Sequence, residues 1–276
     1  MTATDPASWI GRTETCADRI DIGHIEKIAL SLDAAAPVQG GELPLLWHWG
    51  LFVKAYPYDQ LGDDGHPRRG GFLPPAENRN RMWAGGRLEF LSPLRVGMDA
   101  SRVSTIASVK EKEGRTGKLL FVTVKHEYFQ DGLLRISEEQ DVVYREPSPP
   151  RLAGSESAPT AEWSETIVPS STVLFRYSAV TYNGHRIHYD EPYATQVEGY
   201  PGLVVHGPMI ATLMCRAFSR ANPGKAVASL SYRGLRPLIA PRPFQVAGSF
   251  SGAGAARLWA EQDGTLAHQA ELRIKA

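Results

Sequence analysis

The sequence predicts a protein of the α+β class, built from two similar halves. A meander of strand-like segments occurs in each half, and one convincing helix precedes the second meander. Consecutive strands with no helix between them favour an antiparallel sheet, with the helices gathered on one face. Hydrophobic residues make up 42% of the 276 residues, which is enough apolar material for a core.

In the first half, β-branched and aromatic residues bounded by turn residues predict strands. The strand-like segments are 87–98, 101–114, 118–132 and 133–146. Asp131-Gly132 predicts a tight hairpin turn between the last two. Ahead of them, Ile25, Ile28 and Leu32 recur at helical spacing, so we expect an amphipathic helix over 24–35.

The second half repeats this order, with strand-like segments at 228–241, 243–252, 255–264 and 265–275. Asp263-Gly264 takes the place that Asp131-Gly132 has in the first half. The clearest helix is expected over 208–219, where Ile210, Leu213 and Phe218 belong to a wide apolar stripe. A stripe of this width predicts a helix that is wrapped by a sheet.

Between the halves lies a segment rich in Pro, Ser, Ala and Glu. Pro149-Pro150 cannot continue a helix or a central strand. We therefore expect a linker over 147–170, with one domain at 1–146 and a second at 171–276. The similar order of elements on both sides suggests an internal duplication.

Charge and composition exclude several classes of function. Thirty basic and thirty acidic residues cancel, which argues against nucleic acid or an anionic membrane as a partner. No apolar run is long enough to span a bilayer, and the N-terminus predicts no secretory signal. The two cysteines, Cys16 and Cys215, lack metal-type spacing. These features predict a soluble, cytoplasmic protein.

The densest group of polar and aromatic residues lies in 174–194. It contains Asn183, His185, His188 and Asp190, and Asn183-Gly184 predicts a turn that places the histidines on a loop. Such histidines are often structural. A metal site with Asp190 or His206 is a further interpretation, but no spacing of three ligands supports it, so we expect no metal.

Downstream of this loop, Gly207-Pro208 predicts the start of the long helix. A backbone N–H at such a position lacks a partner within the helix and lies at the positive end of its dipole. This arrangement suits an oxyanion, although it also occurs in helix starts without any chemical role.

Two segments carry a family resemblance. RYSAVTYNGHRIHYD followed by YPGLVVHGPMIATLM resembles the MaoC-type hot-dog hydratases and dehydratases of acyl thioesters. The stretch HPRRGGFLPPAENRNRMWAGGRLEFLSPLRVGM resembles the subgroup with an FAS1-like dehydratase domain at its N-terminus. This subgroup includes mesaconyl-C4-CoA and itaconyl-CoA hydratases and mitochondrial type 2 hydroxyacyl-thioester dehydratases.

The resemblance implies a double hot-dog fold. Two tandem domains would each wrap a long antiparallel sheet around a helix, with the N-terminal helix reduced. The N-terminal FAS1-like domain would widen and cover the acyl pocket, and the C-terminal MaoC-like domain would be catalytic. Of the histidines, none in the first half is expected to carry turnover, including His24, His48 and His66.

Carried across by position, the family's general base falls on His188 and its oxyanion amide on Gly207. The acidic residue of the wider family pattern falls on Asn183, which cannot exchange a proton at neutral pH. Either His188 moves the proton alone while Asn183 positions water, which we favour, or an acid such as Asp190 assists. Imidazole suits the base because its pKa lies near neutrality.

For the substrate, the anions to be bound are the phosphates of coenzyme A and an acyl carboxylate, for which arginine is the usual ligand. We expect Arg186, between the two histidines, to bind the acyl carboxylate. The full set of expected substrate contacts is Arg186, His185, Arg176, Tyr189, His206 and Arg81. No cofactor is expected apart from coenzyme A as part of the substrate, and a homodimer is compatible with this interpretation.

The predicted function is hydration or dehydration of a short acyl-CoA, with a C5 dicarboxylic enoyl-CoA of the mesaconyl-C4-CoA or itaconyl-CoA type as the substrate. Three alternatives stay open: a 3-hydroxyacyl-thioester dehydratase of fatty acid synthesis, a hot-dog acyl-CoA thioesterase, and a non-catalytic acyl-thioester binding protein. A thioesterase would usually need a carboxylate near the helix start, where this chain has Val205-His206-Gly207.

Overall fold

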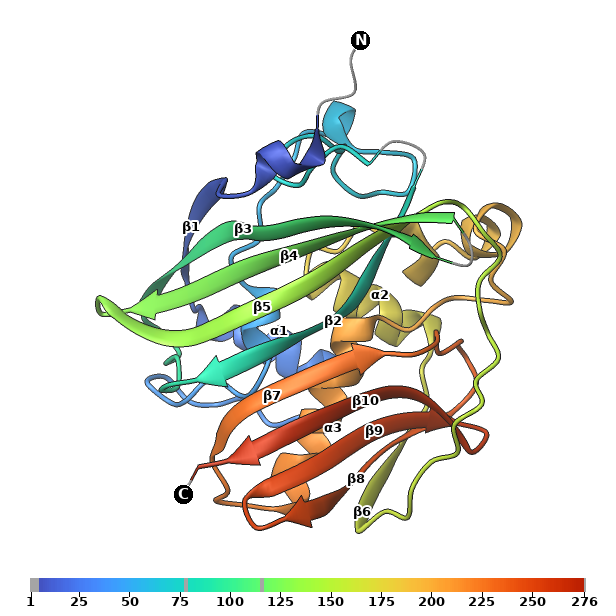
Figure 1. Ribbon diagram of the computed structural model, residues 1–276. Coiled ribbons are helices and arrows are strands. Elements are labelled where there is room, and N and C mark those ends of the chain that lie inside the picture. Colours follow the sequence, from blue (N-terminus) through green and yellow to red (C-terminus); the bar gives the residue numbers. More distant parts are fainter. Residues whose placement is uncertain (1–4, 77–78, 115–116, 276) are drawn as a thin grey trace.

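The computed structural model describes residues 5–76, 79–114 and 117–275. Ten strands form one antiparallel sheet in the order β1-β3-β4-β5-β2-β7-β10-β9-β8-β6 (Figure 1). In chain order they are β1 Thr13–Arg19, β2 Asn80–Phe90, β3 Asp99–Gly114, β4 Gly117–Gln130, β5 Leu133–Arg145, β6 Trp163–Ile167, β7 Val227–Gly234, β8 Phe244–Gly252, β9 Ala255–Gln262 and β10 Thr265–Ile274.

The two halves of the sheet have the same topology. From one edge inward the order is β1-β3-β4-β5-β2, and from the other edge inward it is β6-β8-β9-β10-β7. The halves join where β2 pairs with β7, with Gly86 opposite Tyr232. In each half the helices come between the first and second strands. This repeated order confirms the predicted α+β class with two similar halves.

Both predicted hairpins are present at equivalent places. Asp131-Gly132 joins β4 to β5, and Asp263-Gly264 joins β9 to β10. In each turn both residues have positive φ, 54° and 71° in the first and 55° and 74° in the second. Type I′ turns need this backbone conformation, which Asp-Gly adopts readily.

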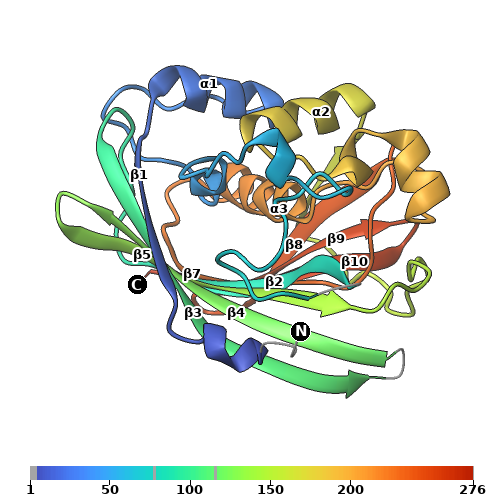
Figure 2. The same ribbon diagram turned by 90° about the horizontal axis from the view of Figure 1, so that it is seen from above.

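The sheet curves around the helices, which lie on its concave side (Figure 2). Helix α3, Gly207–Ala221, packs against β8 and β9 with its apolar face buried, as predicted for 208–219. Helices α1, Ile22–Ser31, and α2, Ser171–Val180, lie side by side over it. No helix in the described ranges is long and apolar enough to cross a membrane.

The ends of α1 differ from the predicted 24–35. The Asp21 side chain accepts a hydrogen bond from the His24 N–H, so the helix begins earlier, at Ile22. It ends at Ser31, and Asp33 has a left-handed φ of 48°, which stops further helix. At ten residues, α1 is shorter than the fifteen-residue α3, in agreement with a reduced N-terminal helix.

Three elements were not predicted. Strands β1 and β6 form the two outer edges of the sheet, and β6 lies inside the predicted linker 147–170. Each is short and pairs on one side only, so its alternation is too brief to separate from loop sequence. Helix α2 is capped by the Ser170 side chain, which accepts from the Val173 N–H. The division at 147–170 otherwise stays a prediction.

Candidate active site

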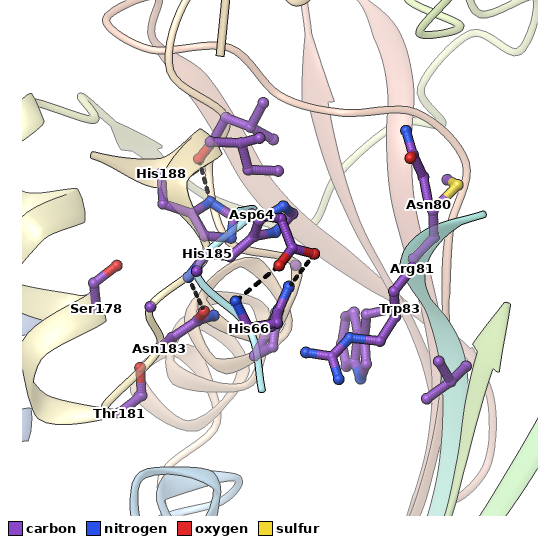
Figure 3. A pocket seen from close by; sticks show the side chains of 18 of the residues that line it. Asp64, His66, Asn80, Arg81, Trp83, Ser178, Thr181, Asn183, His185 and His188 are labelled. Carbon is purple, nitrogen blue, oxygen red and sulfur yellow. Dashed lines mark hydrogen bonds and ion pairs between the residues drawn. The ribbon is translucent and has the colours of Figure 1, made fainter. Parts of the chain in front are cut away.

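Both halves of the chain line one large cavity of about 1320 Å³. Its walls include the start of α3, a short 3-10 helix at Arg186–His188, the inner strand β2 and the loop 61–69 (Figure 3). Of the predicted site residues, Asn183, His185, His188, Tyr189, Gly207 and Arg81 line it. Arg176, Arg186 and His206 do not.

His188 is held as a neutral imidazole with one free ring nitrogen. Its Nδ1 lies 2.7 Å from the backbone oxygen of Val204. Because a carbonyl only accepts, Nδ1 carries the proton and Nε2 is left with a free lone pair. Nε2 makes no hydrogen bond within the described ranges. Burial lowers the pKa of His188 to about 4, so the ring is neutral at pH 7.

Gly207 is the first residue of α3, one residue before the predicted start at Pro208. No described residue accepts a hydrogen bond from its N–H, and the preceding His206 side chain makes no capping bond. A Cβ at Gly207 would lie 2.6 Å from Cε3 of Trp83, so only glycine lets this ring close against the helix start. The N–H therefore borders the cavity as a free donor at the positive end of the helix.

His206 packs against His188 and does not line the cavity, so the substrate contact expected for it stays a prediction. The two imidazole rings stack with centroids 3.7 Å apart and planes 20° apart. His206 Nε2 lies 2.8 Å from Ser178 Oγ, and the side chain is fully buried. His206 directly precedes α3 and is stacked on His188 by the fold. Residue spacing along the sequence does not predict this contact.

The turn at Asn183 is built by the asparagine itself. Its Oδ1 accepts a hydrogen bond of 3.0 Å from the His185 N–H. The Tyr189 hydroxyl donates to the Gly184 carbonyl at 2.8 Å, which braces the same turn. The side-chain oxygen of Asn183 therefore bonds within the turn, and its side-chain N–H₂ group is left to bond to other groups.

Arg186 lies outside the cavity lining, and the role expected for it stays a prediction. Its Nε and Nη2 lie 2.9 and 2.7 Å from one oxygen of Asp190, and its Nη1 donates to the backbone oxygen of Asp63. The i,i+4 spacing places this carboxylate within reach, so Arg186 and Asp190 form a partly exposed ion pair with each other. Arg176 lies exposed on α2, away from the cavity.

Arg81 is the expected arginine that the structure does bring to the cavity. It extends from β2 toward Asp64 and His66 (Figure 3). It has no ion-pair partner in the part of the chain that the structure describes. Burial lowers the pKa of its guanidinium, and the free charge faces the cavity.

The loop 61–69 brings in a pair that sequence reasoning missed. His66 Nδ1 lies 3.1 Å from Asp64 Oδ2, and the other Asp64 oxygen accepts from the His66 backbone N–H at 2.9 Å. A Cβ at Gly65 would lie 1.9 Å from the Gly184 oxygen, so the loop packs directly on the Asn183 turn. The segment HPRRGG was recognised only as part of the family resemblance, and His66 was given no role.

Asp64, His66 and His185 each offer a ligand atom, all within 4.8 Å of one another. Both Asp64 oxygens already accept hydrogen bonds from His66. Burial, and then the positive charge of Arg81, lower the pKa of His66 to about 4. The positive charge of Arg81 would also repel a bound metal cation. We therefore interpret Asp64, His66 and His185 as a hydrogen-bonded acid–base cluster.

Comparison with known proteins defines the class. The chain is similar to the structure of HtdX from Mycobacterium tuberculosis, with a TM-score of 0.70, 17% identity, and coverage of 96% of this chain and 100% of that one. A MaoC-like dehydratase gives a TM-score of 0.71 at 15% identity, over 97% of this chain and 98% of that one. With the repeated strand order, these likenesses confirm the double hot-dog fold.

The family follows from sequence. Residues 46–240 match the model of hydroxyacyl-thioester dehydratase type 2. The mesaconyl-C(4)-CoA hydratase of Chloroflexus aurantiacus is 44% identical over 89% of each chain. The mitochondrial hydroxyacyl-thioester dehydratase type 2 of Schizosaccharomyces pombe is 28% identical over 87% of this chain and 86% of its own. The chain belongs to this family of hydro-lyases.

Proposed function

We propose that the protein adds water to a short enoyl-CoA that carries a second carboxylate, of the mesaconyl-C4-CoA or itaconyl-CoA type. The observation that carries the proposal is one cavity lined by a neutral base, His188, an unpaired helix-start N–H, Gly207, and an unpaired guanidinium, Arg81. Each answers one chemical need of this reaction.

The proposed step is as follows. His188 Nε2 takes a proton from water while the water oxygen bonds to Cβ. The electrons of the double bond move through Cα and C1 to the thioester oxygen, giving an enolate-like charge. The Gly207 N–H donates to that oxygen, an interaction typically worth about 3 kcal/mol of barrier. His188 then returns the proton to Cα, and dehydration follows the reverse path.

Arg81 is proposed to bind the free acyl carboxylate, the role that the sequence had suggested for Arg186. A half-buried guanidinium that forms no ion pair with the described residues matches a carboxylate ligand in charge and geometry. The 44% identity to the Chloroflexus aurantiacus mesaconyl-C(4)-CoA hydratase supports a substrate of this type.

The cavity also suits a long thioester. Its volume of about 1320 Å³ exceeds the roughly 300–1,000 Å³ of ordinary ligand pockets, so it has room for a carrier arm as well as an acyl group. His185 and Tyr189 complete the proposed substrate contacts, and Asn183 braces the turn that presents His188. A homodimer and a cytoplasmic location stay predictions.

A second candidate is dehydration of 3-hydroxyacyl thioesters in fatty acid synthesis. The match of residues 46–240 to the type 2 dehydratase model and the Schizosaccharomyces pombe relative support it. The same base and N–H would serve, because dehydration is the reverse reaction, but Arg81 would then have no carboxylate to bind.

Hydration of a panel of enoyl-CoAs, followed by mass spectrometry, separates these functions. We expect mesaconyl-type thioesters to exceed crotonyl-CoA by about 100-fold or more in kcat/KM, because a buried charge is left unpaired by the uncharged analogue. Arg81→Met should remove this preference, while Arg176→Met, on an exposed arginine outside the cavity, should keep it. Preference for crotonyl-type substrates would favour the second candidate, and release of free acid and CoA a thioesterase.

A further inference from the structure

An attacking water has two protons, and His188 accounts for one of them. Sequence reasoning offered Asn183 or Asp190 as the second partner. The Asn183 oxygen is bonded to the His185 N–H, and Asp190 is paired with Arg186. Both side chains thus already have partners within the protein, and the second proton of the water is left without an assigned acceptor.

We propose that His66, held in place by Asp64, is this second acceptor. His66 would bind the attacking water through Nε2 and orient it for transfer of its other proton to His188. This proposal rests on the proposed hydratase function and adds a catalytic residue from the first half of the chain. Asp64 is then a positioning residue, because it acts through His66.

The hydrogen bonds of Asp64 fix which ring nitrogen of His66 can accept. Burial alone would raise the pKa of Asp64, but the hydrogen bond and charge of His66 outweigh it and hold the pKa below its ordinary value. An ionised carboxylate only accepts, so His66 Nδ1 carries the ring proton and Nε2 keeps its lone pair. Nε2 has no hydrogen-bond partner within the described ranges.

His66 lies beside His185, which in turn lies beside His188. Its ring centroid lies 4.3 Å from that of His185, which in turn lies 5.4 Å from that of His188. All three side chains line the same cavity (Figure 3). Histidines from the two halves thus line one cavity, and the proposal requires that one water lies between Nε2 of His66 and Nε2 of His188.

The loop that carries His66 is fastened to the catalytic turn. The Arg186 N–H donates to the Asp64 backbone oxygen at 3.0 Å, and the Arg186 guanidinium donates to the Asp63 backbone oxygen at 3.0 Å. Gly65 packs against Gly184 with no room for a side chain on either. Rigid support of this kind is what a water-orienting group needs.

Adding His66 as a second acceptor does not change which bonds form and break in the hydration step. The water oxygen bonds to Cβ, one water proton passes through His188 to Cα, and the other stays on the new hydroxyl. His66 accepts a hydrogen bond throughout and gains no net proton. In the reverse direction it would hold the departing hydroxyl in the same way.

Asp64→Asn is the decisive variant. The His66 backbone N–H needs an acceptor, so the asparagine oxygen takes that place and its N–H₂ group faces His66 Nδ1. This stabilises the tautomer with a proton on Nε2, which cannot accept from water. We expect kcat to fall on the order of 100-fold with KM little changed. Asp64→Ala should cost less, since it leaves the tautomer free.

Asp63→Asn is the matched control, because the Asp63 side chain is exposed and the change is identical. We expect wild-type kcat for it and unchanged thermal unfolding for both asparagine variants. His66→Ala should lose kcat on the order of 100-fold and regain part of it with added imidazole, which replaces a missing ring but not a missing support.

Wild-type kcat in Asp64→Asn, or no imidazole rescue of His66→Ala, would overturn the proposal. So would one equivalent of bound zinc that disappears in His66→Ala and whose chelation abolishes activity, since His66 would then be a ligand. If the wild type hydrates no enoyl-CoA at all, the proposed function itself fails, and this inference with it.

Discussion

The two halves share one strand order but treat their helix starts differently. In the first half the Asp21 side chain accepts from the His24 N–H, so the start of α1 has a side-chain cap. In the second half His206 makes no capping bond, and the Gly207 N–H is left free at the cavity. The residue before a helix thus decides whether its N-terminus is only structural or can bind a negative charge.

A similar contrast separates the buried network around Glu138 from the proposed site. In the first half the Glu138 carboxylate accepts from Trp49 Nε1 at 3.0 Å and from the Tyr128 hydroxyl at 2.9 Å, with His48 Nε2 at 3.4 Å. In the site, His188 and His66 each have one ring nitrogen bonded and the other open. Glu138 lines the same cavity as the two histidines, so pairing and not position separates them: a fully paired group stabilises the fold, and a half-paired one can do chemistry.

The largest effect is expected from His188→Ala, which would remove the contrast between the halves. General base catalysis contributes about 10²–10⁴ in rate, so kcat should fall within or beyond that range while substrate binding changes little. Steady-state kinetics with the best enoyl-CoA of the panel measures this. His24→Ala is the control, since His24 bonds to the Gly50 oxygen away from the main cavity. Near wild-type kcat in His188→Ala would move the base to His185 or His66.

A smaller effect, on stability instead of turnover, is expected from Glu138→Gln. Donors approach both carboxylate oxygens, so either orientation of the glutamine amide sets an N–H₂ group against a buried donor. One unsatisfied group costs about 1–3 kcal/mol, which denaturant unfolding measures. Turnover of the folded variant should be unchanged. Loss of kcat without loss of stability would show that the first-half network also takes part in the reaction.

The smallest effect is expected from Asn183→Asp. Aspartate keeps the oxygen that accepts from the His185 N–H, so the turn should persist and activity should be largely retained. Asn183→Ala removes that acceptor and should cost about 10–100-fold in kcat by displacing the histidines. Equal kcat in Asn183→Ala and the wild type would show that the hydrogen bond of the Asn183 side chain is not needed for turnover.

Local sequence patterns determined much of this protein. Helix α3, its start at Gly207 and both Asp-Gly hairpins follow from spacing and backbone preference within a few residues. The motif around His188 identified the family, and through it the fold. These features depend on neighbours along the chain, so the sequence alone predicts them.

Only the tertiary structure decided the partners of the site's side chains. The Asp64–His66 pair meets the Asn183 turn because a loop of the first half packs on the second, with Gly65 against Gly184. Arg186, expected at the substrate, is instead bound to Asp190, and Arg81 from β2 reaches the cavity. A hydrogen bond or ion pair forms with whichever group the fold brings within about 3 Å, and distant segments are brought together only by packing.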